Sequence, residues 1–492
     1  MAARFRFPLH LIALLCGFIA ACGGAHAAPN VLFIAIDDLR NDLGALGNER
    51  ARTPKMDAFA RTARTFSHHY VQVPTCGASR CTLLRGRYPE TAAQLGNGAI
   101  ASTQSQWGDA NLPAWFQRHG YKTYAMGKIT HHPGGRTGKL WAEGPEELPG
   151  SWDRCWIPET PWGAPQHLMH GTANGKPRVP GVTLPLESFD GPDHSYPDAF
   201  VADEAERMLM GLTTSQSPWF LAVGFFKPHL PFACPKSYFD LQGMAPFPAP
   251  GEAAAAKPGW PSTWHRSGEF HGNYARLATD GTDPFPEVAA EVRRAYAACV
   301  SYVDAQVGRV LTTLEKLHLD DNTIVVIWSD HGFLLGEHNI WGKHCLFEKA
   351  LVSPLLIRHP KMNAPGVTTK AVVETVDLFP TLTDLCGLPA PKGLDGRSLR
   401  PQMESPATPS SKPARAWWTQ GWRTLRDDRW RISSRPGIKE QPAAVELFDY
   451  QTDPDETRNL AGEHPEVVSR LMARLHELPP IPVAAGTKPS GE

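Results

Sequence analysis

The sequence predicts an α/β fold: a large doubly wound sheet, mixed but mostly parallel and flanked by helices, with a smaller C-terminal α+β subdomain. Continuous apolar runs such as 30–36 and 323–328 have the composition of strands buried on both faces of a parallel sheet. Between such runs lie segments in which apolar residues recur at three- and four-residue steps, as in helices with one buried face. The alternation of these two patterns is typical of a doubly wound sheet.

Four apolar runs are the candidate strands of this sheet: 30–36, 219–226, 323–328 and 354–357. The first run ends in Asp37 and Asp38, and the third is followed by Ser329, Asp330, His331 and Gly332. Ligands of open α/β sheets bind beyond the carboxyl ends of the strands. Acidic residues after two strands that are about 290 positions apart therefore indicate a site at that edge of the sheet.

One long helix is predicted between residues 292 and 314, because its apolar residues share a face: Val292, Tyr296, Cys299, Val303, Val307, Val310 and Leu314. Beyond it, residues 389–413 have the composition of a Pro/Ser-rich linker. A few antiparallel strands are predicted over 416–435 and 445–450, and a closing helix over 465–478. We therefore expect a main domain over residues 28–390, followed by the linker and a small subdomain over residues 391–492.

The composition is that of a folded and nearly neutral chain. Of its 492 residues, 42% are hydrophobic and 20% are charged, which allows a large core and excludes global disorder. Lys and Arg total 49 and Asp and Glu total 50, so the formal net charge is −1 at pH 7. This balance argues against a general polyanion binder, and we expect no nucleic-acid partner. Any anion that the protein binds must meet a local cluster of positive charge.

The N-terminus has the pattern of an export signal. Arg4 and Arg6 precede an apolar run over residues 8–21, which is too short to span a bilayer comfortably. A small-residue cleavage site at Ala25-His26-Ala27 predicts a signal peptide over residues 1–27 and export to the bacterial periplasm or medium. The alternative is a lipoprotein signal over residues 1–21, because the residues before Cys22 resemble a bacterial lipobox. Only lipidation of Cys22 would then hold the protein on a membrane.

The strongest local signal is Cys76-Gly77-Ala78-Ser79-Arg80. It places a nucleophile precursor at the predicted start of a helix, where backbone N–H groups and the Arg80 guanidinium would face the same anion. Spacing alone leaves open a buried thiol or a Cys76–Cys81 disulfide, since an exported chain could pair some of its cysteines. A cysteine phosphatase is disfavoured, because its Cys-x5-Arg motif would need arginine at position 82, which is Thr.

This segment resembles the signature of the sulfatase family, Cys-x-Pro/Ala-x-Arg followed by a Leu…Gly-Arg tail. Ala78 stands where Pro is usual in that signature, and Arg85 stands where Thr is usual. The resemblance implies the fold of the alkaline-phosphatase-like superfamily and oxidation of Cys76 to formylglycine by a maturation enzyme. The aldehyde would be hydrated to a diol, whose first hydroxyl attacks sulfur. The second hydroxyl ejects the sulfate, which an ordinary Ser or Cys cannot do.

The resemblance extends over nearly the whole mature chain and favours the iduronate-2-sulfatase-like branch of the family. Taken singly, each further element has an ordinary explanation, such as a helix cap, a surface lysine or a hydrogen-bonded histidine. Their occurrence together, in order and around Cys76, favours a site. The elements are Asp37-Asp38, Gly127-Lys128-Ile129-Thr130-His131, Lys227-Pro228-His229, Ser329-Asp330-His331-Gly332, Gly336-Glu337-His338, Trp341-Gly342-Lys343, 394–399 and 446–460.

The resemblance also implies the roles of the site residues. A divalent ion would be held by Asp37, Asp38, Asp330, His331 and the modified Cys76; the hard carboxylate oxygens favour Ca²⁺, with Mg²⁺ as the alternative. Arg80, Lys128 and Lys343 would neutralise charge on the transferred group. His131 would act as the base, and His229, assisted by Lys343, would protonate the leaving oxygen. Lys128, His229 and Lys343 would contact the substrate.

The function that these residues predict is hydrolysis of a sulfate ester in a sulfated saccharide. One alternative is a phosphodiesterase or phosphonate monoester hydrolase on the same fold, because sulfate and phosphate esters share their geometry. Another alternative is a non-catalytic binder of sulfated glycans in which Cys76 is never oxidised. Specificity would come from the loops 131–162 and 245–274, whose Trp, His and Arg content suits stacking on sugar rings. Part of the second loop, 245–261, is either a lid or a surface insertion.

Overall fold

The computed structural model describes residues 28–48, 52–132, 147–163, 165–245, 247–277, 286–437, 442–478 and 481. The predicted signal segment, including Cys22, lies outside these residues, so the two forms of export remain predictions. Among the residues described, none of the helices combines the length and the hydropathy that crossing a bilayer requires.

A sheet of eight strands forms the centre of the described structure, in the order β12-β2-β11-β8-β1-β6-β3-β4. β8, β1, β6, β3 and β4 run parallel to one another, and β12 is parallel to β2, whereas β11 is antiparallel to both β8 and β2. The predicted mixed, mostly parallel sheet is therefore confirmed. Its strands are β1 (Asn30–Ile36), β2 (Arg64–Tyr70), β3 (Lys122–Gly127), β4 (Arg154–Trp156), β6 (Trp219–Phe225), β8 (Thr323–Ser329), β11 (Leu355–Arg358) and β12 (Thr368–Glu374).

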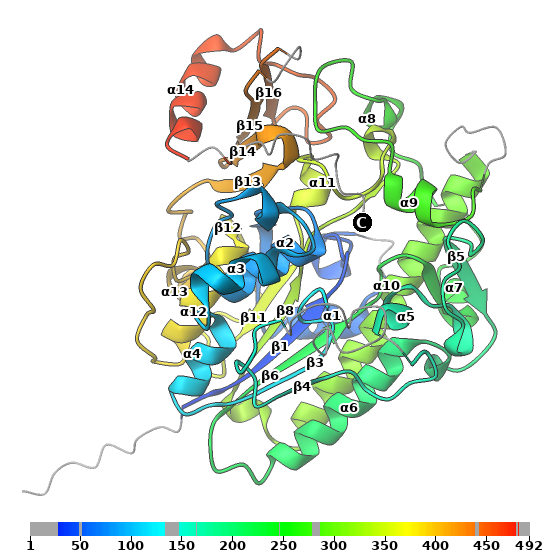
Figure 1. The fold of residues 1–492 in the computed structure, drawn as a ribbon, viewed down its shortest axis with the longest axis vertical. Coiled ribbons are helices and arrows are strands. Elements are labelled where there is room, and N and C mark those ends of the chain that lie inside the picture. Colours follow the sequence, from blue (N-terminus) through cyan, green and yellow to red (C-terminus); the bar gives the residue numbers. More distant parts are fainter. Residues whose placement is uncertain are drawn as a thin grey trace, which may run out of the picture.

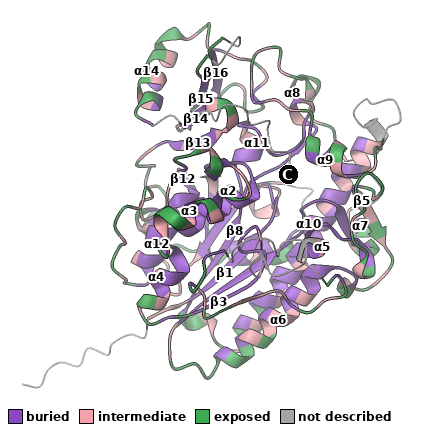
Figure 2. Cartoon of the chain, in the orientation of Figure 1, coloured by how far each residue is buried: buried purple, intermediate pink, exposed green. Residues whose placement is uncertain are grey.

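Helices cover both faces of this sheet (Figure 1). Leu32 and Ile34 of β1 belong to one core with α1 (Pro54–Ala60), α6 (Pro197–Leu212) and α10 (Pro286–Lys316). Val31 and Phe33 belong to a second core with α2 (Cys76–Arg85), α4 (Leu112–Arg118) and α12 (Leu378–Leu385). This is why the strand is apolar at every position rather than at every second one. Figure 2 shows the central strands as the most continuously buried part of the chain.

The helices alternate with the strands along the chain, as predicted, and the long helix α10 contains the whole predicted apolar stripe. The helices are α1 (Pro54–Ala60), α2 (Cys76–Arg85), α3 (Ala99–Trp107), α4 (Leu112–Arg118), α5 (Pro165–His170), α6 (Pro197–Leu212), α7 (Lys236–Leu241), α8 (Glu252–Ala255), α9 (Gly268–Asn273), α10 (Pro286–Lys316), α11 (Glu348–Leu351), α12 (Leu378–Leu385), α13 (Arg400–Glu404) and α14 (Pro465–His476). Two short pairs of strands lie outside the main sheet: β5 (Leu186–Phe189) with β7 (Phe232–Pro235), and β9 (Leu334–Leu335) with β10 (Trp341–Gly342).

The C-terminal part is a small antiparallel sheet with one helix, α14, packed on it (Figure 1). Its strands are β13 (Ala414–Trp418), β14 (Trp422–Arg426), β15 (Trp430–Arg435) and β16 (Ala444–Asp449). The predicted α+β character of this part is confirmed. Leu425, Ile432 and Leu447 belong to the same core as α2 and α12, so the small sheet packs directly on the helical layer of the main domain.

The segment 389–413, predicted as a plain linker, is partly folded. It contains α13, in which Gln402 and Met403 are buried. The buried Arg64 of β2 donates hydrogen bonds to the backbone carbonyls of both residues, at 3.1 and 3.0 Å. Local composition missed this packing because Pro and Ser residues report a lack of regular structure but not a tertiary partner.

Candidate active site

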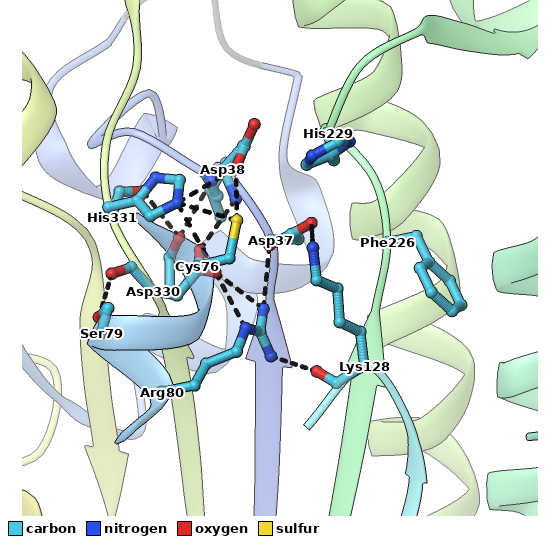
Figure 3. Close-up of polar contacts among 12 residues, drawn as sticks. Asp37, Asp38, Cys76, Ser79, Arg80, Lys128, Phe226, His229, Asp330 and His331 are labelled. Carbon is cyan, nitrogen blue, oxygen red and sulfur yellow. Dashed lines mark hydrogen bonds and ion pairs between the residues drawn. The ribbon is translucent and has the colours of Figure 1, made fainter. Parts of the chain in front are cut away.

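Four neighbouring parallel strands end at one edge of the main sheet, and each is followed by residues of the predicted site. Ile36 of β1 lies opposite Phe225 of β6 and Ser329 of β8, and Gly127 of β3 lies opposite Gly224 of β6. Asp37 and Asp38 follow β1, and Asp330 and His331 follow β8 (Figure 3). Lys128 follows β3, and the segment after β6 leads to His229. Parallel pairing thus brings together side chains that are up to about 290 positions apart.

Two glycines let β3 and β6 approach closely where Lys128 leaves the sheet. A Cβ at Gly224 would lie 2.2 Å from the carbonyl oxygen of Lys128, and a Cβ at Gly127 would lie 2.0 Å from that of Gly224. Gly127 also has φ +68°, which L side chains rarely adopt. The position of Lys128 therefore depends on the absence of side chains at both glycines.

Helix α2 presents Cys76 at its first turn, next to the ends of β1 and β8 (Figure 3). The side chain of Asn97 accepts a hydrogen bond from the backbone N–H of Gly77 at 3.0 Å, and a Cβ at Gly77 would lie 2.3 Å from the Asn97 carbonyl oxygen. Ser79 donates to the backbone carbonyl of Asp330 at 2.5 Å. These contacts hold the start of the helix on the strand ends. Cys76 is buried there, with 2% of its surface exposed.

Three fully buried carboxylates pair with three cationic side chains. Arg80 donates from Nε to Asp330 Oδ2 and from Nη2 to Asp37 Oδ1, both at 3.0 Å. Lys128 Nζ donates a hydrogen bond to Asp37 Oδ2. Lys343 Nζ lies 2.9 and 3.0 Å from the two oxygens of Asp38.

From the sequence, the Arg80 guanidinium was expected to face a bound anion. In the structure it contacts the carboxylates of Asp330 and Asp37 and the backbone carbonyl of Lys128. Burial by itself would raise the pKa of Asp37, but Lys128, His229 and Arg80 hold that pKa well below its usual range. Burial raises the pKa of Asp330. For Lys343, burial would lower the pKa, but Asp38, Cys76 and Glu269 hold it well above its usual range, so this lysine stays cationic.

The donor set fits a divalent cation. One ligand atom from each of Asp37, Asp38, Cys76 and His229 lies within 4.8 Å of the others, and the same holds for Cys76, Asp330 and His331. Nδ1 of His331 donates a hydrogen bond to the carbonyl oxygen of Gly332 at 2.9 Å, so Nε2 is the ring nitrogen that could bind a cation. That Nε2 lies 3.4 Å from Asp38 Oδ1 and 3.8 Å from Asp330 Oδ2. Three carboxylates and one imidazole are ligands for a hard cation such as Ca²⁺ or Mg²⁺.

The unmodified thiol of Cys76 is a poor nucleophile in this position. Burial and the neighbouring Asp37 raise its pKa well above the usual range, so the thiol keeps its proton. Its Sγ lies 3.3 Å from His331 Nε2 and 3.5 Å from Lys343 Nζ. No disulfide joins any of the seven cysteines in the described part of the chain, so the structure does not contain the Cys76–Cys81 bond that spacing left open. Cys81 lies on another side of α2, with Sγ 3.9 Å from Thr103 Oγ1.

Two histidines predicted to transfer protons lie in the same buried cluster. Burial, Lys128 and His132 hold the pKa of His131 well below its usual range, which leaves a neutral imidazole able to accept a proton. His229 is 3% exposed, and its Nδ1 lies 2.7 Å from the carbonyl oxygen of Leu230.

Lys128 and Lys343 are also buried, at 0% and 2% exposed, although solvated surface positions were the ordinary alternative for both. The structure thus brings all the predicted site residues together: Asp37, Asp38, Cys76, Arg80, Lys128, His131, His229, Asp330, His331 and Lys343.

Sequence reasoning missed three residues of this site. Glu269 of α9 lies 3.2 Å from His229 Nε2 and 3.3 Å from Lys343 Nζ. The ring of His170 of α5 lies 5.2 Å from that of His229, centroid to centroid. Trp418 of β13 stacks on His344, at 5.5 Å and 12°. No motif marks these residues; the only sequence signal was the His and Trp content of the loop 245–274, to which Glu269 belongs.

Comparison with known proteins agrees with this geometry. The family model described as Sulfatase matches residues 29–388, and that described as N-sulphoglucosamine sulphohydrolase, C-terminal, matches residues 336–479. Iduronate 2-sulfatase of Mus musculus is 32% identical over 394 residues, covering 74% of this chain and 70% of the relative. Among solved structures, phosphonate monoester hydrolase of Agrobacterium radiobacter superposes with a TM-score of 0.73 at 23% identity, covering 91% of this chain and 95% of that one.

A second solved structure, BT4656 in complex with its substrate D-glucosamine-2-N,6-O-disulfate, has a TM-score of 0.70 at 21% identity and covers 92% of this chain and 97% of that one. These two solved structures share the fold of this chain. The chain belongs to the sulfatase family, and its relatives include iduronate 2-sulfatases that are 32% and 31% identical to it. It is an enzyme that hydrolyses sulfate esters, which argues against the alternative of a non-catalytic glycan binder.

Proposed function

We propose that the protein releases sulfate from a sulfated saccharide, with a formylglycine made from Cys76 as nucleophile and a divalent ion, Ca²⁺ or Mg²⁺, beside it. The observation that carries this proposal is the convergence of Cys76 with Asp37, Asp38, Asp330 and His331 at one sheet edge. Asp37, Asp38, Asp330, His331 and the modified Cys76 would hold the ion, which would supply Lewis-acid polarisation of a sulfate oxygen. The formylglycine supplies a hydroxyl for attack on sulfur and a second hydroxyl for release of the sulfate.

The remaining residues neutralise charge and move protons. Lys128 and Lys343, each beside an aspartate that would bind the ion, offset the negative charge of the sulfate group. Arg80 holds Asp37 and Asp330 in place beneath the nucleophile. Neutral His131 accepts a proton from the nucleophile, and His229 donates one to the leaving oxygen.

The nucleophile is tested by peptide mapping and substitution. We expect the peptide containing position 76 to lack the thiol and to carry an aldehyde. We expect Cys76→Ala to lower kcat/KM for sulfate esters by roughly 10⁴-fold or more, because the attacking group is lost. Cys81→Ala is the matched control, since Cys81 lies on the same helix but contacts Thr103 outside the site. An active Cys76→Ala enzyme, or an active enzyme with an intact thiol at Cys76, contradicts the proposal.

The saccharide substrate is supported by three observations. The relatives include an iduronate 2-sulfatase, and a structural neighbour binds a disulfated glucosamine. Beside Cys76, His344 lies 3.2 Å from Thr75 and stacks on the partly exposed Trp418, an aromatic surface of the kind that packs on sugar rings. Rates on a sulfated uronate, an aryl sulfate, an aryl phosphate diester and a phosphonate monoester test the assignment. A preference for the phosphorus esters would instead establish the phosphodiesterase or phosphonate monoester hydrolase function.

We also propose that the protein is exported and that a maturation enzyme oxidises Cys76 before folding is complete, because the folded chain exposes only 2% of that residue. Export uses either the signal peptide 1–27 or the lipoprotein signal 1–21, after whose removal Cys22 is the first residue of the mature protein. The N-terminal sequence and mass of the mature protein distinguish the two: a start at residue 28 indicates the signal peptide, and a lipid-modified Cys22 indicates the lipoprotein.

A further inference from the structure

Glu269 is a buried carboxylate that the mechanism above does not use. Its side chain is 7% exposed. One oxygen, Oε1, lies 3.2 Å from His229 Nε2, and the other, Oε2, lies 3.3 Å from Lys343 Nζ. It therefore bridges His229 and Lys343, the two residues proposed to serve the leaving oxygen. Burial would raise its pKa, but Lys343 and His229 hold that pKa well below its usual range, so the group is a carboxylate.

The segment that carries Glu269 is docked along the loop that carries Lys343. Trp341 N–H donates to Ser267 Oγ at 2.6 Å, and Leu346 N–H donates to Thr263 Oγ1 at 2.8 Å. Nδ1 of His265 accepts from the N–H of Ser267 at 2.9 Å, so its Nε2 donates to the Lys343 carbonyl oxygen, 3.0 Å away. These contacts fix the segment without help from the Glu269 carboxylate. The carboxylate is thus not required to dock the segment, and its burial beside His229 and Lys343 needs another explanation.

The hydrogen bonds of His229 provide that explanation. Its Nδ1 faces the carbonyl oxygen of Leu230 at 2.7 Å, and a carbonyl only accepts, so Nδ1 carries a proton. Its Nε2 faces the Glu269 carboxylate, which also only accepts, so Nε2 carries a proton as well. An imidazole with both nitrogens protonated is the acid form of histidine.

We propose that Glu269 is a positioning residue for leaving-group protonation: Oε1 keeps the transferable proton on Nε2 of His229. This inference rests on the proposed function. In the step concerned, the bond from sulfur to the leaving oxygen breaks and its electron pair stays on that oxygen. The nucleophile's oxygen forms the new bond to sulfur, and its proton passes to His131. The Nε2 proton of His229 moves to the leaving oxygen, which leaves a neutral ring protonated on Nδ1.

The kinetic test compares Glu269→Gln with the unchanged full-length enzyme on aryl sulfates of decreasing phenol acidity: 4-nitrophenyl, phenyl and 4-methoxyphenyl sulfate. A good leaving group needs no proton, so we expect kcat/KM on 4-nitrophenyl sulfate to stay within about threefold of the unchanged enzyme. On 4-methoxyphenyl sulfate we expect a loss of about 10- to 100-fold. The fraction of Cys76 converted is measured in each preparation, so that differences in maturation do not enter the comparison.

Two further variants make the test specific. Glu252→Gln removes the same charge from an exposed helix of the same loop and is expected to leave all three rates unchanged. In a His229→Ala background, we expect Glu269→Gln to add no further loss on 4-methoxyphenyl sulfate, because the two residues act through one proton.

A second readout does not depend on activity or on conversion of Cys76. In protein with ¹⁵N-labelled histidine, we expect a proton on each ring nitrogen of His229, as its two hydrogen bonds require, and loss of the Nε2 proton in Glu269→Gln. His229→Asn assigns the signals. Equal losses on all aryl sulfates, or an unchanged His229 in Glu269→Gln, overturn the role of Glu269 alone. An unchanged enzyme that hydrolyses no sulfate ester overturns the proposed function, and the role of Glu269 with it.

Discussion

Three buried carboxylates and three buried side-chain cations meet at the floor of the site. The charges of Asp37, Asp38 and Asp330 are offset by those of Arg80, Lys128 and Lys343. A buried charge without a partner is strongly destabilising, so this balance allows the cluster to stay folded without an added ion. Because the protein charges cancel, a bound divalent cation gives the site a net positive charge, and a sulfate ester carries the opposite sign.

The ion is tested at the residue scale with Asp330→Asn. A ligand that binds only the folded state at a concentration 100 times its Kd adds about 2.7 kcal/mol to the free energy of unfolding. We expect Ca²⁺ to raise the melting temperature of the unchanged protein relative to chelator, and Asp330→Asn to lose most of that rise because a carboxylate ligand is removed. Asp240→Asn, at an exposed position on α7, is the control and should keep the full rise. A melting temperature independent of Ca²⁺ and Mg²⁺ in the unchanged protein contradicts the proposed ion beside Cys76.

At the scale of elements, the site depends on how closely two strands pack. Lys128 follows β3, and the segment after β6 leads to His229. The two strands can lie this close because Gly127 and Gly224 carry no side chain. A Cβ at Gly224 would overlap the backbone of Lys128, which cannot move aside as the end of a flexible side chain can.

Gly224→Ala tests this packing. Overpacking a buried position costs typically about 1–3 kcal/mol, so we expect a loss of that size in the free energy of unfolding, with a lower kcat because Lys128 is displaced. Urea unfolding and aryl sulfate kinetics measure the two effects. The matched control is Gly211→Ala in α6, where a Cβ meets nothing within 4 Å; alanine there should add about 0.5–1 kcal/mol. If Gly224→Ala behaves like the control, the close approach does not position Lys128.

At the scale of the whole molecule, the small C-terminal sheet supports the loop that carries Lys343. Arg431 of β15 is fully buried and donates to the carbonyl oxygen of Leu346, three residues after Lys343. Arg431 also pairs with Glu456, whose Oε2 accepts from the backbone N–H of Glu348 at 2.9 Å. The C-terminal part therefore takes part in shaping the site through a buried ion pair.

This ion pair predicts a pH-dependent stability. Burial would raise the pKa of Glu456, but Arg431 and His338 lower it to about 2, against 4.5 for the free group. A carboxyl with a lowered pKa in the folded state stabilises above the unfolded pKa and loses that effect as pH falls through the folded pKa. We expect Glu456→Gln to reduce the free energy of unfolding by about 3 kcal/mol at pH 7, and the difference to shrink as pH falls below about 4.5 toward 2.

Urea unfolding at pH 7, 5 and 3 measures this difference. The control is Glu463→Gln, whose partner Arg458 is exposed; such pairs contribute about 0–1 kcal/mol, and the difference should be small at every pH. A Glu456→Gln difference that stays constant from pH 7 to pH 3 is the result that contradicts the prediction.

Local pattern alone determined much of this protein. The fully apolar runs became β1, β6 and β8, and the stripe from Val292 to Leu314 became the buried face of α10, because burial imposes a composition that can be read along the chain. Strand ends also marked Asp37, Asp38 and Asp330. The other site residues were recognised from the resemblance of their motifs to those of the sulfatase family.

Only the tertiary structure decided which distant groups meet. In the structure, β11 is antiparallel to β8, and Arg80 contacts two carboxylates. Part of the expected linker packs against Arg64, and Glu269 lies between His229 and Lys343. Each of these depends on contacts between segments far apart in the chain, and such contacts leave no periodicity or spacing in the local sequence. The residues of the site could be found from strand ends and family motifs in the sequence, whereas their partners follow from how the whole chain packs.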